Sequence, residues 1–457
     1  MKSFIRCCAL LCCTAMMMTG AGCSVLEAFM GNKPEPTQPP EEQIPVKMVW
    51  EVPEEIVLVA DNAAYGSAPC EWKVYADEKD VSDQVTVSVE DTAVAAFENG
   101  VATAVGRGNT FLTVSYESET KKIPVYVLGA QEGYDLSDSK SVRTFGRTYM
   151  EDGTLCIPNV ASGFEVSFIG TSLQANLSAI APTLTGTVKV YVDGEFTKYL
   201  NYPADFDRVD LCKDLEEGFH TVKVLKMTEQ GYLRVRLSEL KTDGTALTAF
   251  PSSDLRFEFY GDSITSGFGN LGITSQFKEC EDGTQTYATM LGEYFGADCD
   301  MISYAGVPAC LPVDHSHLLM GQFFDKVDAA SNLPYDFEAN PVDLVVINLG
   351  TNDAGSAEKT VSNMAEGYAD LLRSIRAKRP GVPILCVYGM MGVDGDIDAG
   401  INRAIDDVLS EGETDIYYLW LFSDTSGYKG HPKVAVGHTN AFEEMKTYIL
   451  DRNLLEK

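Results

Sequence analysis

The sequence is poor in basic residues, in histidine and in long hydrophobic runs. Its 457 residues include 35 Lys and Arg against 67 Asp and Glu, a formal charge of −32, and only five His. A surface this acidic repels phosphate backbones and anionic lipid headgroups, so nucleic acid is disfavoured as a partner and a neutral or cationic ligand is favoured. The apolar run Cys7–Met18 has twelve residues and is too short to cross a bilayer.

Signatures of metal, nucleotide and redox sites are also missing. The sequence has no HExxH motif, no glycine-rich phosphate loop and no CxxC pair beyond residue 23, so no metal, nucleotide or flavin cofactor is expected. Seven cysteines follow Cys23, an odd number with wide spacing that is typical of buried thiols and not of a dense disulfide framework. A bridge between Cys280 and Cys299 stays open as an alternative.

The first 45 residues indicate a targeting segment followed by a tether. A positively charged start, the short apolar run and small residues up to Cys23 are typical of a secretory signal. They resemble a bacterial lipoprotein signal, in which residues 1–22 are removed and Cys23 carries the lipid; a plain signal peptide is the alternative. Residues 23–45 contain the proline-rich stretch Gly31–Pro45, which predicts an extended tether roughly 45 Å long. The protein is then expected at the cell surface, anchored to the outer face of the bacterial cell membrane.

Residues 46–250 predict two β-sandwiches. Short runs with period-two alternation, separated by turn residues, are typical of such folds. The segment from Ala93 to Tyr116 resembles bacterial Ig-like domains, which assigns residues 46–130 to an Ig-like domain acting as a spacer. Residues 131–250 are again strand-rich, with a hairpin signal at Asp193-Gly194, and a jelly-roll sandwich is expected there.

After Pro251 the pattern changes to strands that alternate with helices. Five apolar runs separated by helical stretches predict a five-stranded parallel sheet covered on both faces, so residues 251–457 are expected to form a three-layer α/β domain. Functional residues in such sheets lie at the carboxyl ends of the strands. The residues that follow the first, second, third and last runs are Gly261-Asp262-Ser263, Gly306, Gly350-Thr351-Asn352-Asp353 and His431.

These residue types at the strand ends fit serine hydrolase chemistry. Ser263 would attack an acyl carbon, while His431 would take its proton and later return it to the leaving alcohol. The backbone N–H groups of Ser263 and Gly306 and the side-chain amide of Asn352 would stabilise the oxyanion of the tetrahedral intermediate. Asp262 is expected to hold the turn by bonding backbone amides.

The order Ser263, Gly306, Asn352, His431 resembles the four defining residues of the SGNH, or GDSL-type, hydrolases, over about 200 residues. A sandwich followed by FEFYGDSITSGFGN, together with QTYATMLGEYF and HPKVAVGHTNAFEEMKTYI, is similar to carbohydrate esterase family 2 over about 320 residues. This resemblance implies removal of acetyl groups from polysaccharides such as xylan or glucomannan, with an acetylated polysaccharide or oligosaccharide as the partner.

One position departs from the superfamily pattern. Its members usually carry an aspartate two or three residues before the histidine, where this sequence has Lys429 and Tyr428. Two arrangements stay open. In the favoured one, a Ser–His dyad operates and the backbone carbonyl of Lys429 orients the His431 ring; in the other, Asp424 folds back and completes a triad.

The remaining polar and aromatic clusters are expected to be structural or to line the cleft. His220 and His438 are expected to be structural, and the aromatic run Tyr417–Phe422 is expected to be a buried strand. The motif Asp314-His315-Ser316-His317 has no clear third metal ligand and is expected to line the substrate cleft. Two other functions stay open: a surface glycan-binding protein whose hydrolase domain is weak or inactive, and an esterase that acts on another acyl ester.

Overall fold

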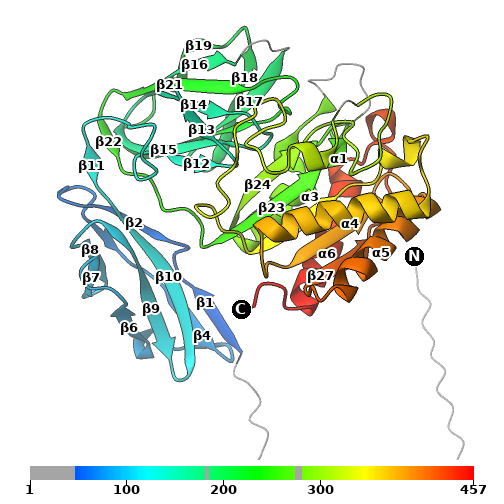
Figure 1. Ribbon diagram of the computed structural model, residues 1–457. Coiled ribbons are helices and arrows are strands. Elements are labelled where there is room, and N and C mark those ends of the chain that lie inside the picture. The colour runs from blue at the N-terminus through cyan, green and yellow to red at the C-terminus, as the bar shows by residue number, and fades with distance from the viewer. Residues whose placement is uncertain (1–46, 181–184, 273–279, 317, 457) are drawn as a thin grey trace, which may run out of the picture. The chain divides into compact units, whose positions relative to one another are not determined.

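The computed structural model describes residues 47–180, 185–272, 280–316 and 318–456 (Figure 1). The predicted signal segment, the lipidation site Cys23 and the proline-rich tether lie outside the described residues. No helix in the described part of the chain is long and apolar enough to span a membrane.

Residues 48–128 form three small sheets around one hydrophobic core. The strand orders are β1-β4-β5, β2-β10-β9-β6 and β3-β8-β7. Alternate residues of β9 (Gly108–Tyr116) are buried, which is the period-two pattern expected for a strand with one face toward a core. The other strands are β1 Met48–Glu51, β2 Ile56–Val59, β3 Ser67–Pro69, β4 Lys73–Ala76, β5 Lys79–Asp80, β6 Thr86–Val89, β7 Ala95–Glu98, β8 Val101–Ala104 and β10 Glu119–Leu128.

Residues 130–247 form two antiparallel sheets that share a second core. One sheet has the order β11-β22-β15-β20-β17-β18, with β12 also paired to β15, and the other has the order β13-β14-β21-β16-β19. The predicted hairpin at Asp193-Gly194 is confirmed: it joins β17 to β18, and both residues have positive φ, at 51° and 82°. We call these two sheets the sandwich domain. Its strands are β11 Ala130–Gln131, β12 Arg143–Phe145, β13 Tyr149–Glu151, β14 Thr154–Ile157, β15 Gly163–Gly170, β16 Leu173–Ala179, β17 Gly186–Val192, β18 Glu195–Tyr202, β19 Asp207–Cys212, β20 Gly218–Lys226, β21 Val235–Thr242 and β22 Thr245–Leu247.

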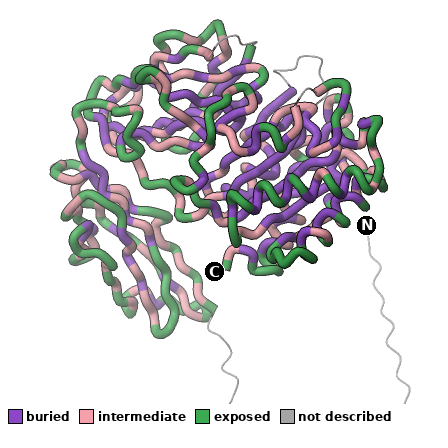
Figure 2. The backbone as a smooth tube through the Cα atoms, in the orientation of Figure 1, coloured by how far each residue is buried: buried purple, intermediate pink, exposed green. Residues whose placement is uncertain are grey.

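The C-terminal part of the chain has the predicted five-stranded parallel sheet, in the order β24-β23-β25-β26-β27. Phe257 and Phe259 of β23 pack with α3 and α6 on one face, whereas Tyr260 packs with α4 and α5 on the other. The central strands are buried, while the outward face of α4 is exposed (Figure 2). The elements are β23 Leu255–Gly261, α1 Ser263–Ser266, α3 Tyr287–Phe295, β24 Ala297–Ser303, β25 Leu344–Asn348, α4 Val361–Lys378, β26 Ile384–Tyr388, α5 Gly395–Ser410, β27 Ile416–Trp420 and α6 Thr439–Asp451.

Two expectations about this part of the chain need correction or completion. The run Tyr417–Phe422 is not a fully buried strand, because Trp420 is 51% exposed and Phe422 is 48% exposed. The reason is that β27 is the edge strand of the sheet and pairs with β26 alone among the described strands. Cys280 and Cys299 are both free thiols, so the alternative of a bridge between them is not realised.

A buried ion-pair cluster joins the sandwich domain to the parallel sheet. Arg147, between β12 and β13, is 1% exposed and donates to Glu258 of β23 at 2.6 Å. Arg379 donates to the same carboxylate at 3.0 Å through two nitrogens. Burial raises the pKa of Glu258, but the two guanidinium groups outweigh burial and hold its pKa below the usual value.

Replacing Arg147 by Met is expected to lower the free energy of unfolding by about 3 kcal/mol, because a buried carboxylate loses one of its two charged partners. Urea denaturation measures the change. Arg208→Met is the matched control, since Arg208 pairs with Glu239 at the surface and should contribute less than about 1 kcal/mol. Equal effects of the two substitutions would show that burial does not set the strength of the Arg147 contact.

Candidate active site

Ser263 follows β23, an inner strand of the parallel sheet, and is the first residue of α1. The Asp262 side chain caps this short helix by accepting from the Ile264 N–H at 2.9 Å, which is the turn-holding role expected of it. Gly261 is required at the strand end because a Cβ there would lie 1.9 Å from Oγ1 of Thr265. The strand, the cap and the close packing together give the Ser263 hydroxyl a fixed position.

His431 meets Ser263 from a loop 168 residues further along the chain. Its Nε2 lies 2.8 Å from the Ser263 Oγ. Gly269, at φ +77°, packs against His431, and a Cβ on Gly269 would lie 2.8 Å from the Cβ of His431. The Phe268 ring contacts the imidazole edge to face at 4.8 Å between centroids. The contact with Ser263 is therefore held by packing on two sides.

The Nδ1 atom of His431 is held by a backbone carbonyl. It lies 3.1 Å from the Tyr428 carbonyl oxygen, which also accepts from the His431 backbone N–H at 3.2 Å. The prediction named the carbonyl of Lys429, one residue later, and that carbonyl also acts on the ring by raising its pKa. The Tyr428 carbonyl joins it because the tight turn through Lys429, whose φ is +52°, brings the carbonyl three residues before His431 next to its ring. An Nδ1–H donated to this oxygen leaves Nε2 free to accept from Ser263.

The environment keeps the His431 ring neutral. Burial lowers its pKa below the usual 6.5, the carbonyls of Tyr428 and Lys429 partly oppose this, and the charge of Lys429 adds to the lowering. A neutral imidazole is the form that can accept a proton from a serine hydroxyl.

The Asp424 carboxylate bonds the backbone of its own loop and not the His431 ring. The carboxylate accepts from the backbone N–H groups of Ser426, Lys433 and Gly437 at 3.0, 2.9 and 3.1 Å. Burial raises its pKa, but these hydrogen bonds outweigh burial and lower it overall. Of the two arrangements left open by the sequence, the geometry therefore matches the carbonyl-supported dyad, with Asp424 holding the loop that carries His431.

Replacing Asp424 by Asn is expected to lower the melting temperature while kcat/KM for an activated ester falls less than about tenfold. The amide keeps one acceptor for the loop, whereas an aspartate that orients a catalytic histidine would cost about 10⁴-fold on the same replacement. Steady-state kinetics and thermal unfolding of the full chain provide the two measurements. A loss of about 10⁴-fold with unchanged folding would instead assign Asp424 to a triad.

Gly306 and Asn352 follow the two strands that flank β23, which are β24 and β25. Gly306, at φ +82°, is in the turn after β24. Asn352 follows β25, and its Nδ2 donates to Asp262 at 3.1 Å and to the Val307 carbonyl at 3.0 Å. Asn352 thus ties the Ser263 turn to the Gly306 turn. Since both hydrogens already have acceptors, an oxyanion would have to share one of them.

Two buried carboxylates support these turns, and one was missed by sequence reasoning. Burial, together with the nearby Asp353, raises the pKa of Asp262 to about 7. Asp353 accepts from three consecutive backbone N–H groups, those of Ala309, Cys310 and Leu311, at 2.7 to 2.9 Å, and so holds the segment after Gly306. Its place directly after Asn352 was the available signal, because Asp commonly bonds backbone amides in turns.

The other histidines occupy separate environments. His315 is exposed beside Gly306 and Asn352, with Nε2 3.3 Å from Oδ1 of Asn352, a position at the rim of this site. His317 lies outside the described residues, and no metal-ligating cluster of three or more residues occurs among the described ones. His438 is fully buried and stacks on Tyr287, and His220 bonds Asp193 on the sandwich domain, so both are structural as expected.

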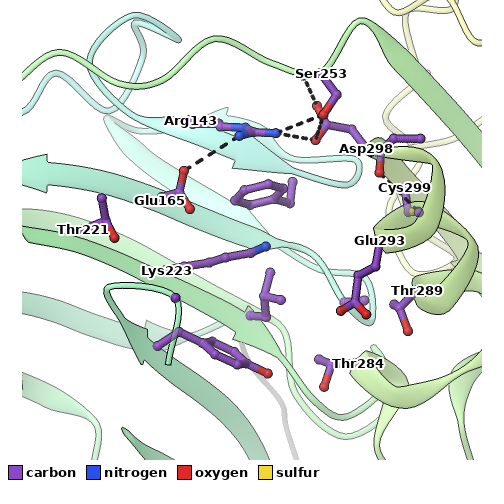
Figure 3. A pocket seen from close by; sticks show the side chains of 18 residues that line it. Arg143, Glu165, Thr221, Lys223, Ser253, Thr284, Thr289, Glu293, Asp298 and Cys299 are labelled. Atoms are coloured by element: carbon purple, nitrogen blue, oxygen red, sulfur yellow. Dashed lines mark hydrogen bonds and ion pairs between the residues drawn. The ribbon is translucent and has the colours of Figure 1, made fainter. Parts of the chain in front are cut away.

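A cavity of about 420 Å³ between the sandwich domain and α3 contains none of the predicted catalytic residues. Figure 3 shows Arg143 crossing it to Asp298, at 2.7 Å, and toward Glu165, at 3.8 Å. Its lining includes Ser253 and Ala297, which lie at the amino ends of β23 and β24. The serine and histidine lie at the opposite, carboxyl end of the sheet, where parallel α/β sheets carry their sites.

Two family models match the chain around this geometry. Residues 144–251 match the carbohydrate esterase 2 N-terminal family, and residues 259–420 match the GDSL-like lipase/acylhydrolase family. Within this chain, a GDSL-like lipase/acylhydrolase domain therefore follows a carbohydrate esterase 2 N-terminal domain. The predicted resemblance to these families is thereby confirmed.

The chain is similar to bacterial proteins that are named as esterases. It is 25% identical over 288 residues to "Cellulase/esterase CelE" of Acetivibrio thermocellus, covering 60% of this chain and 35% of that protein. It is 26% identical over 206 residues to "Acetylxylan esterase / glucomannan deacetylase" of Cellvibrio japonicus, covering 42% of this chain and 54% of that protein. The chain therefore spans only about a third to a half of the length of these relatives.

Solved structures show the same fold. A family two carbohydrate esterase from Clostridium thermocellum in complex with cellohexaose superposes with a TM-score of 0.63 at 23% identity, covering 68% of this chain and 99% of that one. The acetyl xylan esterase Est2A from Butyrivibrio proteoclasticus superposes with a TM-score of 0.62 at 21% identity, covering 69% and 97%. The sandwich domain and the parallel sheet thus recur together as one arrangement.

Proposed function

We propose that this protein is a carbohydrate O-acetylesterase that removes acetyl groups from polysaccharides such as xylan or glucomannan through a serine acyl-enzyme. The observation that carries the proposal is the 2.8 Å contact between Ser263 Oγ and His431 Nε2 at the carboxyl end of the sheet. The names of the relatives support the substrate class, and the acidic composition suits a neutral glycan.

The chemistry proceeds in two halves. Ser263 Oγ bonds to the acetyl carbon as its proton passes to His431 Nε2, and the imidazolium then gives that proton to the sugar oxygen as the ester bond breaks. Water next attacks the acetyl carbon while His431 takes its proton, and the imidazolium returns that proton to Ser263 Oγ as the bond from Oγ to the acetyl carbon breaks and acetic acid leaves. The backbone N–H groups of Ser263 and Gly306, with Asn352 sharing one of its hydrogens, stabilise the oxyanion in both halves.

We also propose that the protein acts at the cell surface. The support is in the sequence: residues 1–22 resemble a lipoprotein signal, Cys23 stands where the lipid would be attached, and a proline-rich stretch runs up to residue 45. Residues 46–130 then serve as an Ig-like spacer before the jelly-roll domain, residues 131–250, and the hydrolase domain, residues 251–457. Metabolic labelling with a fatty acid in the native host tests the anchor, and Cys23→Ser should abolish the label.

Acetate release from acetylated xylan and glucomannan by the full chain tests the enzymatic proposal. Release that depends on Ser263 is the expected result. Turnover of p-nitrophenyl acetate without release from either polysaccharide would assign the protein to another acyl ester. Binding to glycans with no turnover of any ester would favour the alternative of an inactive glycan-binding protein.

A further inference from the structure

The sandwich domain reaches the candidate active site through one buried loop. This loop, residues 227–234, connects β20 to β21 and belongs to the part of the chain that matches the carbohydrate esterase 2 N-terminal family. Glu229 and Gln230 in it are 4% and 5% exposed. Two polar side chains this deeply buried call for specific partners, since an unpaired buried polar group is costly.

Both side chains bond the end of β24 and the turn that follows it. The Glu229 carboxylate accepts from the Ala305 N–H at 2.7 Å. Gln230 donates to the Ser303 carbonyl at 3.2 Å and accepts from the Ala329 N–H at 2.8 Å. The loop therefore contacts the residue immediately before Gly306, the predicted oxyanion donor.

The turn Tyr304–Val307 has the geometry of a type II turn. The Val307 N–H donates to the Tyr304 carbonyl at 3.2 Å, and Gly306 in the third position has a φ of +82° while Ala305 has no positive φ. Types I and II differ in the direction of the central peptide, here the one between Ala305 and Gly306. A flip of that peptide would replace the Gly306 N–H by the Ala305 carbonyl on the same side of the turn.

Three of the four N–H groups in this turn are already engaged. Tyr304 donates to the Gly261 carbonyl at 3.3 Å, Ala305 donates to Glu229, and Val307 donates to Tyr304. The N–H of Gly306 takes part in none of these bonds. The bond to Glu229 holds the peptide between Tyr304 and Ala305. This peptide is next to the one between Ala305 and Gly306, which must keep its orientation for the Gly306 N–H to point toward the substrate.

We propose that Glu229 is a positioning residue for the oxyanion hole, whose carboxylate holds the Ala305 N–H so that the turn presents the Gly306 N–H to the reacting carbonyl oxygen. The inference rests on the proposed esterase function. It assigns the sandwich domain a part in the geometry of the reaction, in addition to its packing against the hydrolase sheet.

Glu229 lies in a buried group of charged residues that holds its loop in place. Its backbone N–H donates to Glu281 at 2.6 Å, and Lys226 lies in the same buried group, with its amine donating to the Thr228 carbonyl at 2.6 Å. Burial raises the pKa of Glu229 to about 7, while the Ala305 bond and Lys226 oppose this. An oxygen acceptor is present in either protonation state, so acceptor geometry rather than charge is the property that the turn requires.

The test compares Glu229→Leu, Glu229→Gln and the matched control Thr228→Val in the full chain. Glu229→Leu removes the acceptor and should lower kcat for p-nitrophenyl acetate about 10- to 100-fold with KM unchanged, less than the 10²–10³-fold cost of losing a whole oxyanion donor. Glu229→Gln keeps an acceptor oxygen and should stay within about threefold of the parent. Thr228→Val removes the contact with the Thr187 N–H, on the same loop but away from the turn, and should change melting temperature more than kcat.

Hydrogen exchange of the segment 303–307 provides a readout that does not depend on activity. Exchange at Ala305 should be faster in Glu229→Leu than in the parent, and unchanged in Thr228→Val. An unchanged kcat or unchanged exchange in Glu229→Leu, or an equal loss in Glu229→Gln, would overturn the positioning role while the Ser263-dependent activity of the parent stands. If the parent shows no Ser263-dependent turnover, the proposed function itself fails and the positioning role falls with it.

Discussion

Ser263→Ala is expected to lower kcat for acetyl ester hydrolysis about 10⁴- to 10⁶-fold, with little change in melting temperature. The hydroxyl oxygen is the atom that bonds to the acyl carbon, and it is the group that lies 2.8 Å from His431 Nε2, the atom that takes its proton. The remaining turnover would come from substrate binding and the oxyanion donors alone. Steady-state kinetics on p-nitrophenyl acetate and acetate release from acetylated xylan measure the loss.

Ser266→Ala is the matched control for this experiment. Ser266 lies on the same short helix and is also buried, but its hydroxyl bonds Ser303 at 2.9 Å and Glu229 at 3.5 Å, not His431. Its replacement should leave kcat within about tenfold, since it removes these two hydrogen bonds and leaves the bond from Ala305 to Glu229 in place. If Ser263→Ala retained activity comparable with Ser266→Ala, Ser263 would not be the nucleophile and the dyad assignment would be wrong.

His431→Ala is expected to cause the second large loss, again about 10⁴-fold or more in kcat. The substitution removes the base that takes the Ser263 proton in the first half of the reaction and activates water in the second. His220→Ala is the control, because His220 lies in the sandwich domain bonded to Asp193 and should not affect turnover. If His431→Ala lowered kcat only slightly, His431 would not be the general base.

The pH dependence provides an independent check on His431. Because burial holds its pKa below 6.5, the base stays neutral at pH 7, and activity is lost only as pH falls through that lowered pKa. The acid limb of the kcat/KM profile should therefore show an apparent pKa below 6.5. Lys429→Gln removes the positive charge that adds to the lowering, so the limb should move to higher pH. A limb above 6.5 in the parent would contradict the neutral, buried imidazole.

Much of the hydrolase domain was predictable because its signals are local. Buried parallel strands appear as continuous apolar runs, and each run ends at a turn residue that can be read directly. Gly261-Asp262-Ser263 and Gly350-Thr351-Asn352-Asp353 therefore located two strand ends at the same edge of the sheet. The hairpin at Asp193-Gly194 was predictable for the same reason, since two residues that tolerate positive φ determine the turn.

The support of the site was less predictable because it depends on partners distant in the chain. The run Tyr417–Phe422 has the composition of a buried strand, yet its position at the edge of the sheet leaves Trp420 and Phe422 half exposed. Edge or centre is decided by strand order, which hydrophobic periodicity does not encode. The contact of the Tyr428 carbonyl with His431 and the backbone contacts of Asp424 likewise follow from how one loop folds.

By itself the sequence determined the order of the elements and the residues at the carboxyl ends of the strands, because apolar periodicity and turn chemistry act over a few neighbouring residues. Only the tertiary structure decided which groups hold those residues in place. Ser263 and His431 are 168 residues apart, and Glu229 reaches Ala305 from another domain across 76 residues. Contacts of this kind arise from the packing of one domain on another, and packing is a property of the folded chain that no short stretch of residues specifies.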